Sequence, residues 1–184
     1  MLPGLEQLVV QCAPQVAPVT MMAIVKVESG GNPLALNVNG PQRLARQPGS
    51  RAEAIAWSEW LISRGYSIDM GLAQVNSGNL RKLRADVGAM FDPCANLAAG
   101  ASILSSEYSG AARRLGTGQD ALRAALSAYN TGNHRAGIAN GYVARVTQAA
   151  QRPDRRPMRA PPLRTVAMSA GEGPNSPRVF FARR

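Results

Sequence analysis

The sequence predicts a compact, mainly α-helical domain with a small extended segment, followed by a disordered tail. Apolar residues recur at spacings of three and four along most of the first 150 residues, whereas β-branched and polar residues rarely alternate. With 184 residues and 45% hydrophobic content, the chain can bury one good core. We therefore expect one domain over residues 1–150 and a separate tail over residues 151–184.

The expected helices are set by apolar stripes between start and stop signals. Pro18 suits a first helical turn, and Asp92 followed by Pro93 is a second strong start signal. The stretch 31–50 is rich in Asn, Gly, Pro and Gln and is expected to be loop, while 66–71 is expected to be a strand or hairpin arm. Helices are expected at residues 5–12, 18–29, 51–63, 77–87, 93–108, 120–129 and 141–150.

The formal net charge of +10 is concentrated in the tail. Residues 151–184 hold eight arginines against Asp154 and Glu172, together with many Pro and Gly residues. This composition cannot build a packed core, so the tail is expected to be disordered, and its arginines favour an anionic partner. Basic residues of the first 150 are scattered rather than gathered on one helix, so no nucleic-acid partner is expected.

Several other classes of function find no support in the sequence. No run of about 18 apolar residues is present, so no membrane span is predicted, and no signal peptide is visible at the N-terminus. Two cysteines and one histidine without close spacing do not form a metal-binding pattern, and no cofactor is expected. By position alone, Cys12 and Cys94 are either two buried thiols or a disulfide, which requires an oxidising compartment.

The segment ESGGNP, which begins at Glu28, places one carboxylate at the end of an apolar helix. The i+3, i+4 and i+7 spacings put it on the same face as Met21, Ile24 and Val25. A carboxyl that loses hydration against an apolar wall has a raised pKa, and the negative end of the helix dipole acts in the same direction. Such a group can act as a general acid near neutral pH. The alternative is that Glu28 points into water.

Two further motifs carry uncharged polar side chains. In GLAQVN, residues 71–76, the amides of Gln74 and Asn76 alternate with apolar residues in a short extended piece. In AYNTG, Tyr129 and Asn130 lie at a helix C-terminus. Hydroxyls, amides and aromatic faces suit a sugar, which offers hydroxyl and acetamido groups and few charges. Taken singly, each motif is weak, and the second also fits an ordinary helix cap.

Taken together and in this order, the three motifs resemble those of the SLT-type lytic transglycosylases. The resemblance covers roughly residues 12–150 and implies an α+β, lysozyme-like fold. Finer details are similar to the subgroup associated with type IV secretion and conjugation systems. These details are the Cys-Ala-Pro that begins at Cys12, the segment ALNVN at 35–39, and the pattern from Phe91 to Gly100.

The resemblance also implies roles for particular residues. Glu28 is implied to be the catalytic acid/base, with Ser29 helping to orient it. Ala73 stands where many relatives have a bulkier residue, often methionine, so one sugar-contacting surface is expected to be missing. The other implied roles are Gln74 and Asn76 lining the sugar groove, Tyr129 beside the catalytic carboxyl, Asn130 supporting it, Tyr142 near the groove, and Asn37 contacting the substrate acetamido group.

The implied activity is cleavage of the MurNAc–GlcNAc β-1,4 bond of peptidoglycan with formation of a 1,6-anhydromuramoyl end. One carboxylate suffices for this reaction, because the muramoyl C6 hydroxyl rather than water attacks C1. Asp69 is the other candidate carboxylate, although accepting backbone N–H bonds in a tight turn is its favoured role. The alternative functions are a hydrolytic muramidase on the same fold and a non-catalytic peptidoglycan-docking assembly factor.

Peptidoglycan lies outside the cytoplasmic membrane, so the resemblance implies a periplasmic protein. In that compartment a Cys12–Cys94 disulfide becomes the expected state, and it would tie the first helix to the helix that begins at Pro93. The tail is expected to recruit type IV secretion-channel subunits or anionic groups of the wall or membrane. A solvated tail without a partner is the alternative.

Overall fold

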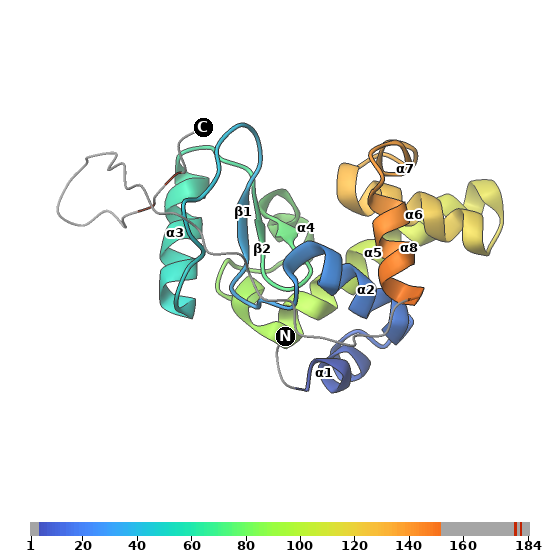
Figure 1. Cartoon of the computed structure of the whole chain (residues 1–184), viewed down its shortest axis with the longest axis horizontal. Helices are drawn as coiled ribbons and strands as arrows, with labels where there is room; N and C mark the ends of the chain where they lie inside the picture. Colours follow the sequence, from blue (N-terminus) through green and yellow to red (C-terminus); the bar gives the residue numbers. More distant parts are fainter. Residues whose placement is uncertain (1–3, 152–178, 180, 182–184) are drawn as a thin grey trace.

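The computed structural model describes residues 4–151, 179 and 181, and it confirms a mainly α-helical fold with a small sheet. Figure 1 shows the strands beside α3 at one end of the molecule and α6, α7 and α8 at the other. The helices are α1 (Leu5–Cys12), α2 (Pro18–Ser29), α3 (Arg51–Ser63), α4 (Leu80–Leu83), α5 (Pro93–Leu115), α6 (Gln119–Thr131), α7 (Ala136–Ala139) and α8 (Tyr142–Gln151), with 3-10 turns η1 (Ser77–Asn79) and η2 (Ala89–Phe91).

The main helices begin and end where local chemistry requires. Pro18 is the first residue of α2, where its missing N–H is not needed. The side chains of Ser50 and Asp92 accept hydrogen bonds of 3.2 and 2.8 Å from the N–H three residues further on, at the starts of α3 and α5. Gly30 ends α2 in the left-handed region, with φ 61°. The predicted boundaries of α2 and α3 are therefore confirmed.

The sheet has three short antiparallel strands in the order β1-β2-β3: β1 (Leu36–Val38), β2 (Ile68–Met70) and β3 (Val75–Asn76). The predicted extended segment is confirmed as β2, but the prediction of loop throughout 31–50 was wrong, because β1 lies within it. The side-chain amide of Gln47 both donates to and accepts from the backbone of Leu36, at 3.0 and 2.8 Å. This contact satisfies one edge of β1 through a residue that no local pattern identifies.

The predicted helix over 77–87 was also wrong in length. The chain forms η1 and then the single turn α4, which stops where Arg84 adopts a left-handed φ of 51°. Val87 therefore lies beyond the helix rather than on its apolar stripe. The short helix α7 was not predicted at all.

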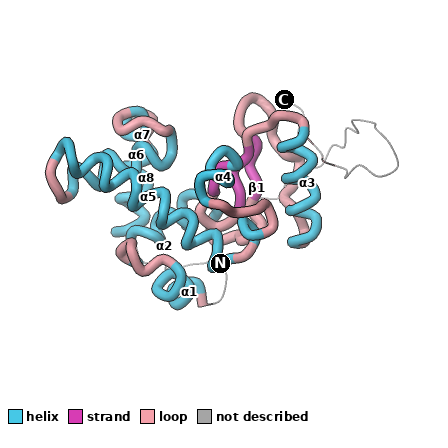
Figure 2. Tube along the Cα trace, turned by 180° about the vertical axis from the view of Figure 1, so that it is seen from behind, coloured by secondary structure: helices cyan, strands magenta, loops and turns pink. Residues whose placement is uncertain are grey.

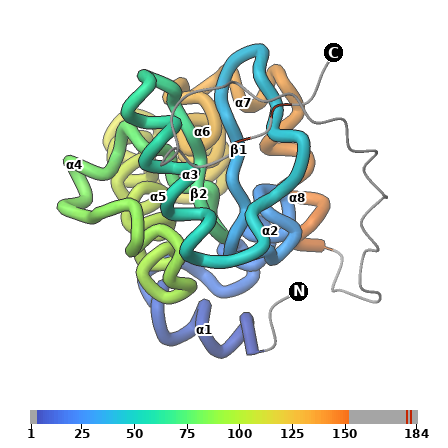
Figure 3. The backbone as a smooth tube through the Cα atoms, turned by 90° about the vertical axis from the view of Figure 1, so that its left-hand side faces the viewer, coloured from blue at the N-terminus to red at the C-terminus, as the bar shows by residue number. Residues whose placement is uncertain are grey.

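The core is arranged around α5, which packs against α6 and α1, while α2 packs against α8. On the other side, Trp57 and Leu61 of α3 are buried in the same core as Ile68 and Met70 of β2. Figure 2 shows the strands between α3 and α4, and Figure 3 shows α1 and α7 at opposite ends of the molecule. The sheet with α3 and the helices α6–α8 thus form two halves joined by α2 and α5.

A disulfide joins Cys12, the last residue of α1, to Cys94, the second residue of α5. The two Cα atoms lie 5.2 Å apart across a sequence separation of 82 residues. The disulfide closes most of the domain into one loop.

The predictions of a boundary near residue 150 and of a disordered tail fall mostly on residues 152–178, 180 and 182–184, which lie outside the described residues. Helix α8 ends at Gln151. Val179 is buried, and the ring of Phe181 lies 5.8 Å from that of Tyr66. None of the helices within the described part of the chain combines the length and the hydropathy needed to cross a bilayer.

Candidate functional site

A cleft of about 390 Å³ lies between the sheet and the helical half of the molecule. Its walls come from the end of α2, from the sheet and its turns, from the middle of α5, and from the C-terminus of α6. Most of the lining groups are uncharged amides, hydroxyls and backbone. The lining residues are Glu28, Asn39, Ser67, Asp69, Gln74, Val75, Asn76, Asn79, Ile103, Glu107, Ala128, Tyr129, Asn130, Thr131 and Gly132.

Glu28 reaches this cleft from the last turn of α2, with its helical neighbours Met21, Ile24 and Val25 fully buried. The helical spacing and the Gly30 stop therefore place one carboxyl at the boundary between the core and the cleft. Burial raises the pKa of Glu28 to about 7. The alternative, a glutamate pointing into bulk water, does not hold.

Tyr142 supports this carboxyl from behind. Its side chain is buried, and its hydroxyl donates a hydrogen bond of 2.6 Å to Oε1 of Glu28. This bond favours the ionised form and partly offsets the effect of burial on the pKa of Glu28, while the charge of Asp69 raises that pKa and Arg145 lowers it. The pKa of Tyr142 itself is raised, chiefly by burial, so Tyr142 stays a proton donor at neutral pH.

Gln74 stands in a strained turn rather than in a regular strand. Its φ of 48° is left-handed, although the residue is not glycine. Its side-chain amide donates to the carbonyls of Ala35 and Gly71 at 3.1 and 3.0 Å, which fixes its orientation. Strain of this kind persists only where the surroundings impose it, and it is common at binding sites.

Asn96, on α5 and fully buried, holds this turn in place. Its amide donates to the carbonyls of Met70 and Met90 at 2.8 and 2.9 Å and accepts from the N–H of Ala73 at 2.7 Å. A Cβ on Gly71 would lie 2.4 Å from the Asn96 amide nitrogen, so glycine is required there. The GLAQVN motif is therefore anchored to α5 by a residue outside the three sequence motifs.

Tyr129 lines the cleft, but its hydroxyl donates at 2.6 Å to the carbonyl of Ala73 rather than to Glu28. The pKa of Tyr129 is raised, first by burial and then by the nearby charge of Glu28. Ala73 is fully buried and faces Gly100, where an added Cβ would lie 2.6 Å from its own Cβ. The side chain at position 73 thus packs inward, away from the cleft.

Asp69 lies on β2 and accepts hydrogen bonds from three side-chain amides, not from a backbone turn as expected. Asn76 donates to one carboxylate oxygen at 2.7 Å, and Asn39 and Asn37 donate to the other at 2.9 and 3.4 Å. Because β2 is the central strand, its neighbours on both sides present asparagines to the same carboxylate. The sheet thus places three side-chain amides around the half-buried carboxylate of Asp69.

The other predicted residues lie near the site in different ways. Ser29 donates to the carbonyl of Val25 at 3.1 Å and accepts from Gly31 at 3.2 Å, so it fixes the helix end that carries Glu28. Asn130 lines the cleft and accepts from Asn140 at 3.0 Å. Asn37 is exposed on β1 and reaches the site through Asp69 rather than as part of the cleft wall.

Outside the three motifs, sequence reasoning missed four polar residues of the cleft wall. Asn39 and Ser67 enter through the pairing of β1 with β2, and Asn79 follows the third strand. Glu107 lies about four turns into α5, and its sequence context is that of an ordinary solvated charge. Only Asn39 carried a signal, since it belongs to the ALNVN segment whose Asn37 was selected instead.

The arrangement supports proton transfer to a neutral, polyhydroxylated ligand. Glu28 can give up or take a proton near neutral pH, and amides and hydroxyls can bind an uncharged substrate. No group of three or more metal-ligating side chains occurs among residues 4–151, 179 and 181. Within the cleft, Glu28 is the group whose pKa is raised to about 7, and Tyr142 is its hydrogen-bond donor.

Comparisons with known proteins identify the family of this chain. The family model described as "Transglycosylase SLT domain" matches residues 9–151. The chain is 49% identical over 129 residues to "Type IV secretion system protein virB1" of Brucella abortus, covering 70% of this chain and 54% of that protein. It is 37% identical over 171 residues to "Protein virB1" of Agrobacterium fabrum, covering 92% and 66%, respectively.

The chain is also 41% identical over 142 residues to "Protein virB1" of Rhizobium radiobacter, covering 77% of this chain and 58% of that protein. It therefore spans between about half and two thirds of the length of these relatives. No solved structure matches the chain significantly. Since the family model covers all three motifs and the whole cleft, this chain belongs to the transglycosylase SLT domain family.

Proposed function

We propose that this chain is a lytic transglycosylase that cleaves the MurNAc–GlcNAc β-1,4 bond of peptidoglycan and leaves a 1,6-anhydromuramoyl end. The observation that carries the proposal is the half-buried position of Glu28 at the wall of the cleft, where its pKa of about 7 suits both donation and acceptance of a proton. The amides and hydroxyls that line the rest of the cleft suit the sugar and acetamido groups of such a strand.

In the first step, protonated Glu28 donates its proton to the glycosidic oxygen as the bond to muramoyl C1 breaks. The substrate acetamido group stabilises the positive charge that develops at C1. In the second step, the Glu28 carboxylate takes the proton of the muramoyl C6 hydroxyl, whose oxygen forms the new bond to C1. Glu28 is thereby restored, and no water is consumed.

This sequence of steps requires one residue to act first as acid and then as base. A pKa near the working pH serves both tasks, and the Tyr142 hydroxyl stabilises the carboxylate that exists between them. The attacking hydroxyl belongs to the same sugar as C1, so no separate nucleophile has to be bound and oriented. The amides of Gln74 and Asn76 and the ring of Tyr129 would hold the strand in place.

The cellular setting is part of the same proposal. All three relatives described above are named virB1, and one of them is named as a type IV secretion system protein. We infer that this chain opens the wall for a secretion or conjugation machine. The work is expected to take place in the periplasm, where peptidoglycan is accessible and where a Cys12–Cys94 disulfide persists. Channel subunits are the expected partners of residues 151–184.

Digestion of purified sacculi, followed by mass analysis of released muropeptides, tests the activity. Wild-type protein should release 1,6-anhydro products, and Glu28→Gln should lower the rate by at least about a hundredfold. The control is Glu59→Gln, the same change at an exposed position of α3, which should retain wild-type activity. Equal, near-zero release by wild type and Glu28→Gln would refute the transglycosylase and leave peptidoglycan docking without cleavage as the alternative.

A second candidate, a hydrolytic muramidase, is favoured by one observation. Asp69 places a second carboxylate in the same cleft and raises the pKa of Glu28 by its charge. Most glycoside hydrolases use two such groups. Release of muropeptides with reducing muramic ends, which are heavier than anhydro ends by one water, would support a hydrolytic muramidase in place of the transglycosylase. In that case, Asp69→Asn should abolish the release of muropeptides.

The role of the tail is tested separately. A chain ending at Gln151 should still cleave soluble glycan fragments, while its recruitment to secretion-channel subunits in cells should be lost. Loss of cleavage by this truncated chain would contradict the proposed domain boundary. Unchanged recruitment would contradict the proposed partner.

A further inference from the structure

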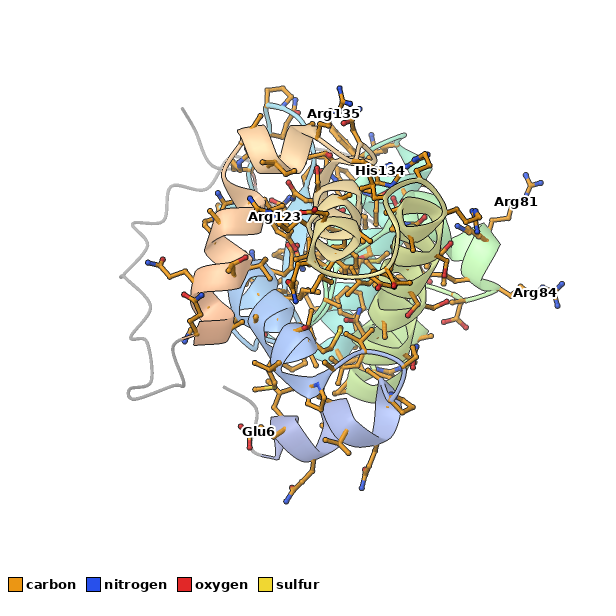
Figure 4. All side chains as sticks on the ribbon, turned by 90° about the vertical axis from the view of Figure 1, so that its right-hand side faces the viewer. Glu6, Arg81, Arg84, Arg123, His134 and Arg135 are labelled. Carbon is orange, nitrogen blue, oxygen red and sulfur yellow. A yellow bond between two sulfur atoms is a disulfide. The ribbon has the colours of Figure 1, made fainter. Side chains whose placement is uncertain are left out.

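A second and larger concavity, of about 720 Å³, lies at the far end of the helical half. It is formed where the C-terminus of α5, the first turns of α6 and the segment leading into α7 meet. Arg114, Arg123, His134 and Arg135 supply basic side chains to it, and we refer to it as the arginine pocket. Figure 4 shows Arg123, His134 and Arg135 on one face, apart from Arg81 of α4 and Arg84 directly after that helix.

The charges of the arginine pocket are poorly balanced. Asp120 is the one carboxylate among its lining residues, against three guanidinium groups. Arg114 contacts the ring of His134, but the guanidinium groups of Arg123 and Arg135 make no ion pair or hydrogen bond with any described residue. Guanidinium groups in a concave site bind carboxylates through paired N–H···O bonds, so the pocket suits a ligand with carboxylate groups.

The pocket also has an apolar component. Leu115 and Ile138 line it and are 56% and 42% exposed, which makes them two of the few large hydrophobic side chains left in contact with water among the described residues. A ligand that combines carboxylates with short aliphatic groups would therefore cover more of the pocket than an inorganic anion would. A short acidic peptide has this composition.

The arginine pocket adjoins the catalytic cleft. Residues from Tyr129 to Gly132 line the cleft, and the next three residues line the pocket. A second link runs across the helices, because Nε2 of His134 lies 3.4 Å from a carboxylate oxygen of Glu107, which lines the cleft. Arg123 precedes Tyr129 by six residues of α6, or about 9 Å along the helix axis. A ligand in the cleft can therefore extend a branch into the pocket.

We propose that the arginine pocket binds the carboxylates of a peptide stem on the glycan strand whose sugars occupy the cleft. This inference rests on the proposed function, since it assigns the second part of the same substrate. The strand itself is neutral apart from its stems, which carry free carboxylates and alanine methyl groups. Arg123 and Arg135 bind the carboxylates, and Leu115 and Ile138 contact the aliphatic parts.

The first experiment measures binding without catalysis. A free stem tripeptide, L-alanyl-γ-D-glutamyl-diaminopimelate, is titrated into the full chain while backbone amide shifts are followed by NMR. Shifts should appear at Ala124 and Ile138 and should be lost in Arg123→Gln/Arg135→Gln. The same peptide with its carboxylates amidated should cause none. Absence of shifts with the unmodified peptide would overturn the proposal and leave an acidic protein as the occupant that fits the pocket.

The second experiment compares cleavage of soluble glycan strands that bear stems with strands from which an amidase has removed the stems. Arg123→Gln/Arg135→Gln should lower kcat/KM on stem-bearing strands by about three- to tenfold more than on stripped strands. The matched control, Arg81→Gln/Arg84→Gln, removes the same charge from α4 and the residue that follows it, and it should not distinguish the two substrates.

The two experiments also separate this inference from the proposed function. Equal losses of kcat/KM on both kinds of strand, or an equal loss in the Arg81→Gln/Arg84→Gln control, would overturn stem binding by the arginine pocket. Neither result would contradict the transglycosylase activity. Peptide-dependent shifts in a protein that cleaves neither kind of strand would support the pocket and refute the transglycosylase. Each result therefore tests one of the two statements by itself.

Discussion

Tyr142 donates a hydrogen bond of 2.6 Å to Oε1 of Glu28, joining the first residue of α8 to the last turn of α2 across 114 residues of sequence. Both side chains are held by the packing of α2 against α8. The bond orients the carboxyl toward the cleft and stabilises its ionised form, while burial stabilises its neutral form. The position of the proton on Glu28 therefore depends on the contact between these two helices.

Replacing Tyr142 by phenylalanine should move the alkaline limit of activity upward. The substitution removes a hydrogen bond to the charged form of Glu28, so the pKa of Glu28 rises further, by about one unit. The maximal rate should fall, because the carboxylate formed in the first step loses its donor. The pH dependence of kcat on soluble strands measures both effects, and Tyr108→Phe, a change outside the cleft, is the control. An unshifted limit in Tyr142→Phe would contradict this account of the pKa.

Glu28→Gln should stabilise the protein, and the gain should grow with pH. The pKa of Glu28 is about 7 in the folded protein against 4.5 unperturbed, so the folded state holds the proton where the unfolded state has released it. Stability therefore falls as pH rises from about 4.5 to about 7, and the neutral amide escapes this loss, worth up to about 3 kcal/mol. Urea denaturation at pH 4 and pH 8, with Glu59→Gln as the reference, measures it. A gain that is equal at both pH values would refute the raised pKa.

The sequence was most informative where structure is local. Pro18 and Gly30 set the two ends of α2 and so the position of Glu28, and the Asp92 cap sets the start of α5. Each of these residues acts within one helical turn. Glu28 also faces the apolar wall predicted from its helical spacing. These features need no knowledge of the rest of the chain.

The remaining features depend on contacts between distant segments. Strand β1 is stabilised by its pairing with β2 and by the side chain of Gln47. Neither contact can be recognised from the sequence, because three residues are too few to show an alternating hydrophobic pattern. The separate tasks of the two tyrosines likewise depend on packing, since Tyr142 reaches Glu28 while Tyr129 reaches Ala73. The arginine pocket joins three helical segments, and its basic residues look scattered in the sequence.

Gly100→Ala should disturb the cleft through α5. The new Cβ would lie 2.6 Å from the Cβ of Ala73 and 3.0 Å from the Tyr129 hydroxyl, so α5 or the Gln74 turn has to move. We expect a loss of about 1–3 kcal/mol in the free energy of unfolding and a lower kcat/KM. Gly110→Ala lies in the same helix, but its Cβ would be 3.8 Å from the flexible end of the Arg113 side chain, so this change should instead stabilise by about 0.5–1 kcal/mol. If Gly100→Ala changed neither the free energy of unfolding nor kcat/KM, the contact of α5 with Ala73 and Tyr129 would have room for an added methyl group.

Removing the disulfide should cost stability but not chemistry. The Cys12–Cys94 bond closes a sequence separation of 82 residues, for which the chain-entropy relation gives about 4–5 kcal/mol, with measured losses usually 2–5 kcal/mol. Neither cysteine lines the cleft, so Cys12→Ala/Cys94→Ala should keep its activity per folded molecule at temperatures well below its Tm. Urea denaturation with and without a reducing agent measures the loss, and the agent should lower the stability of the wild type alone. An equal response in the double variant would mean that the reductant acts elsewhere, and a wild type that does not respond would contradict a stabilising disulfide.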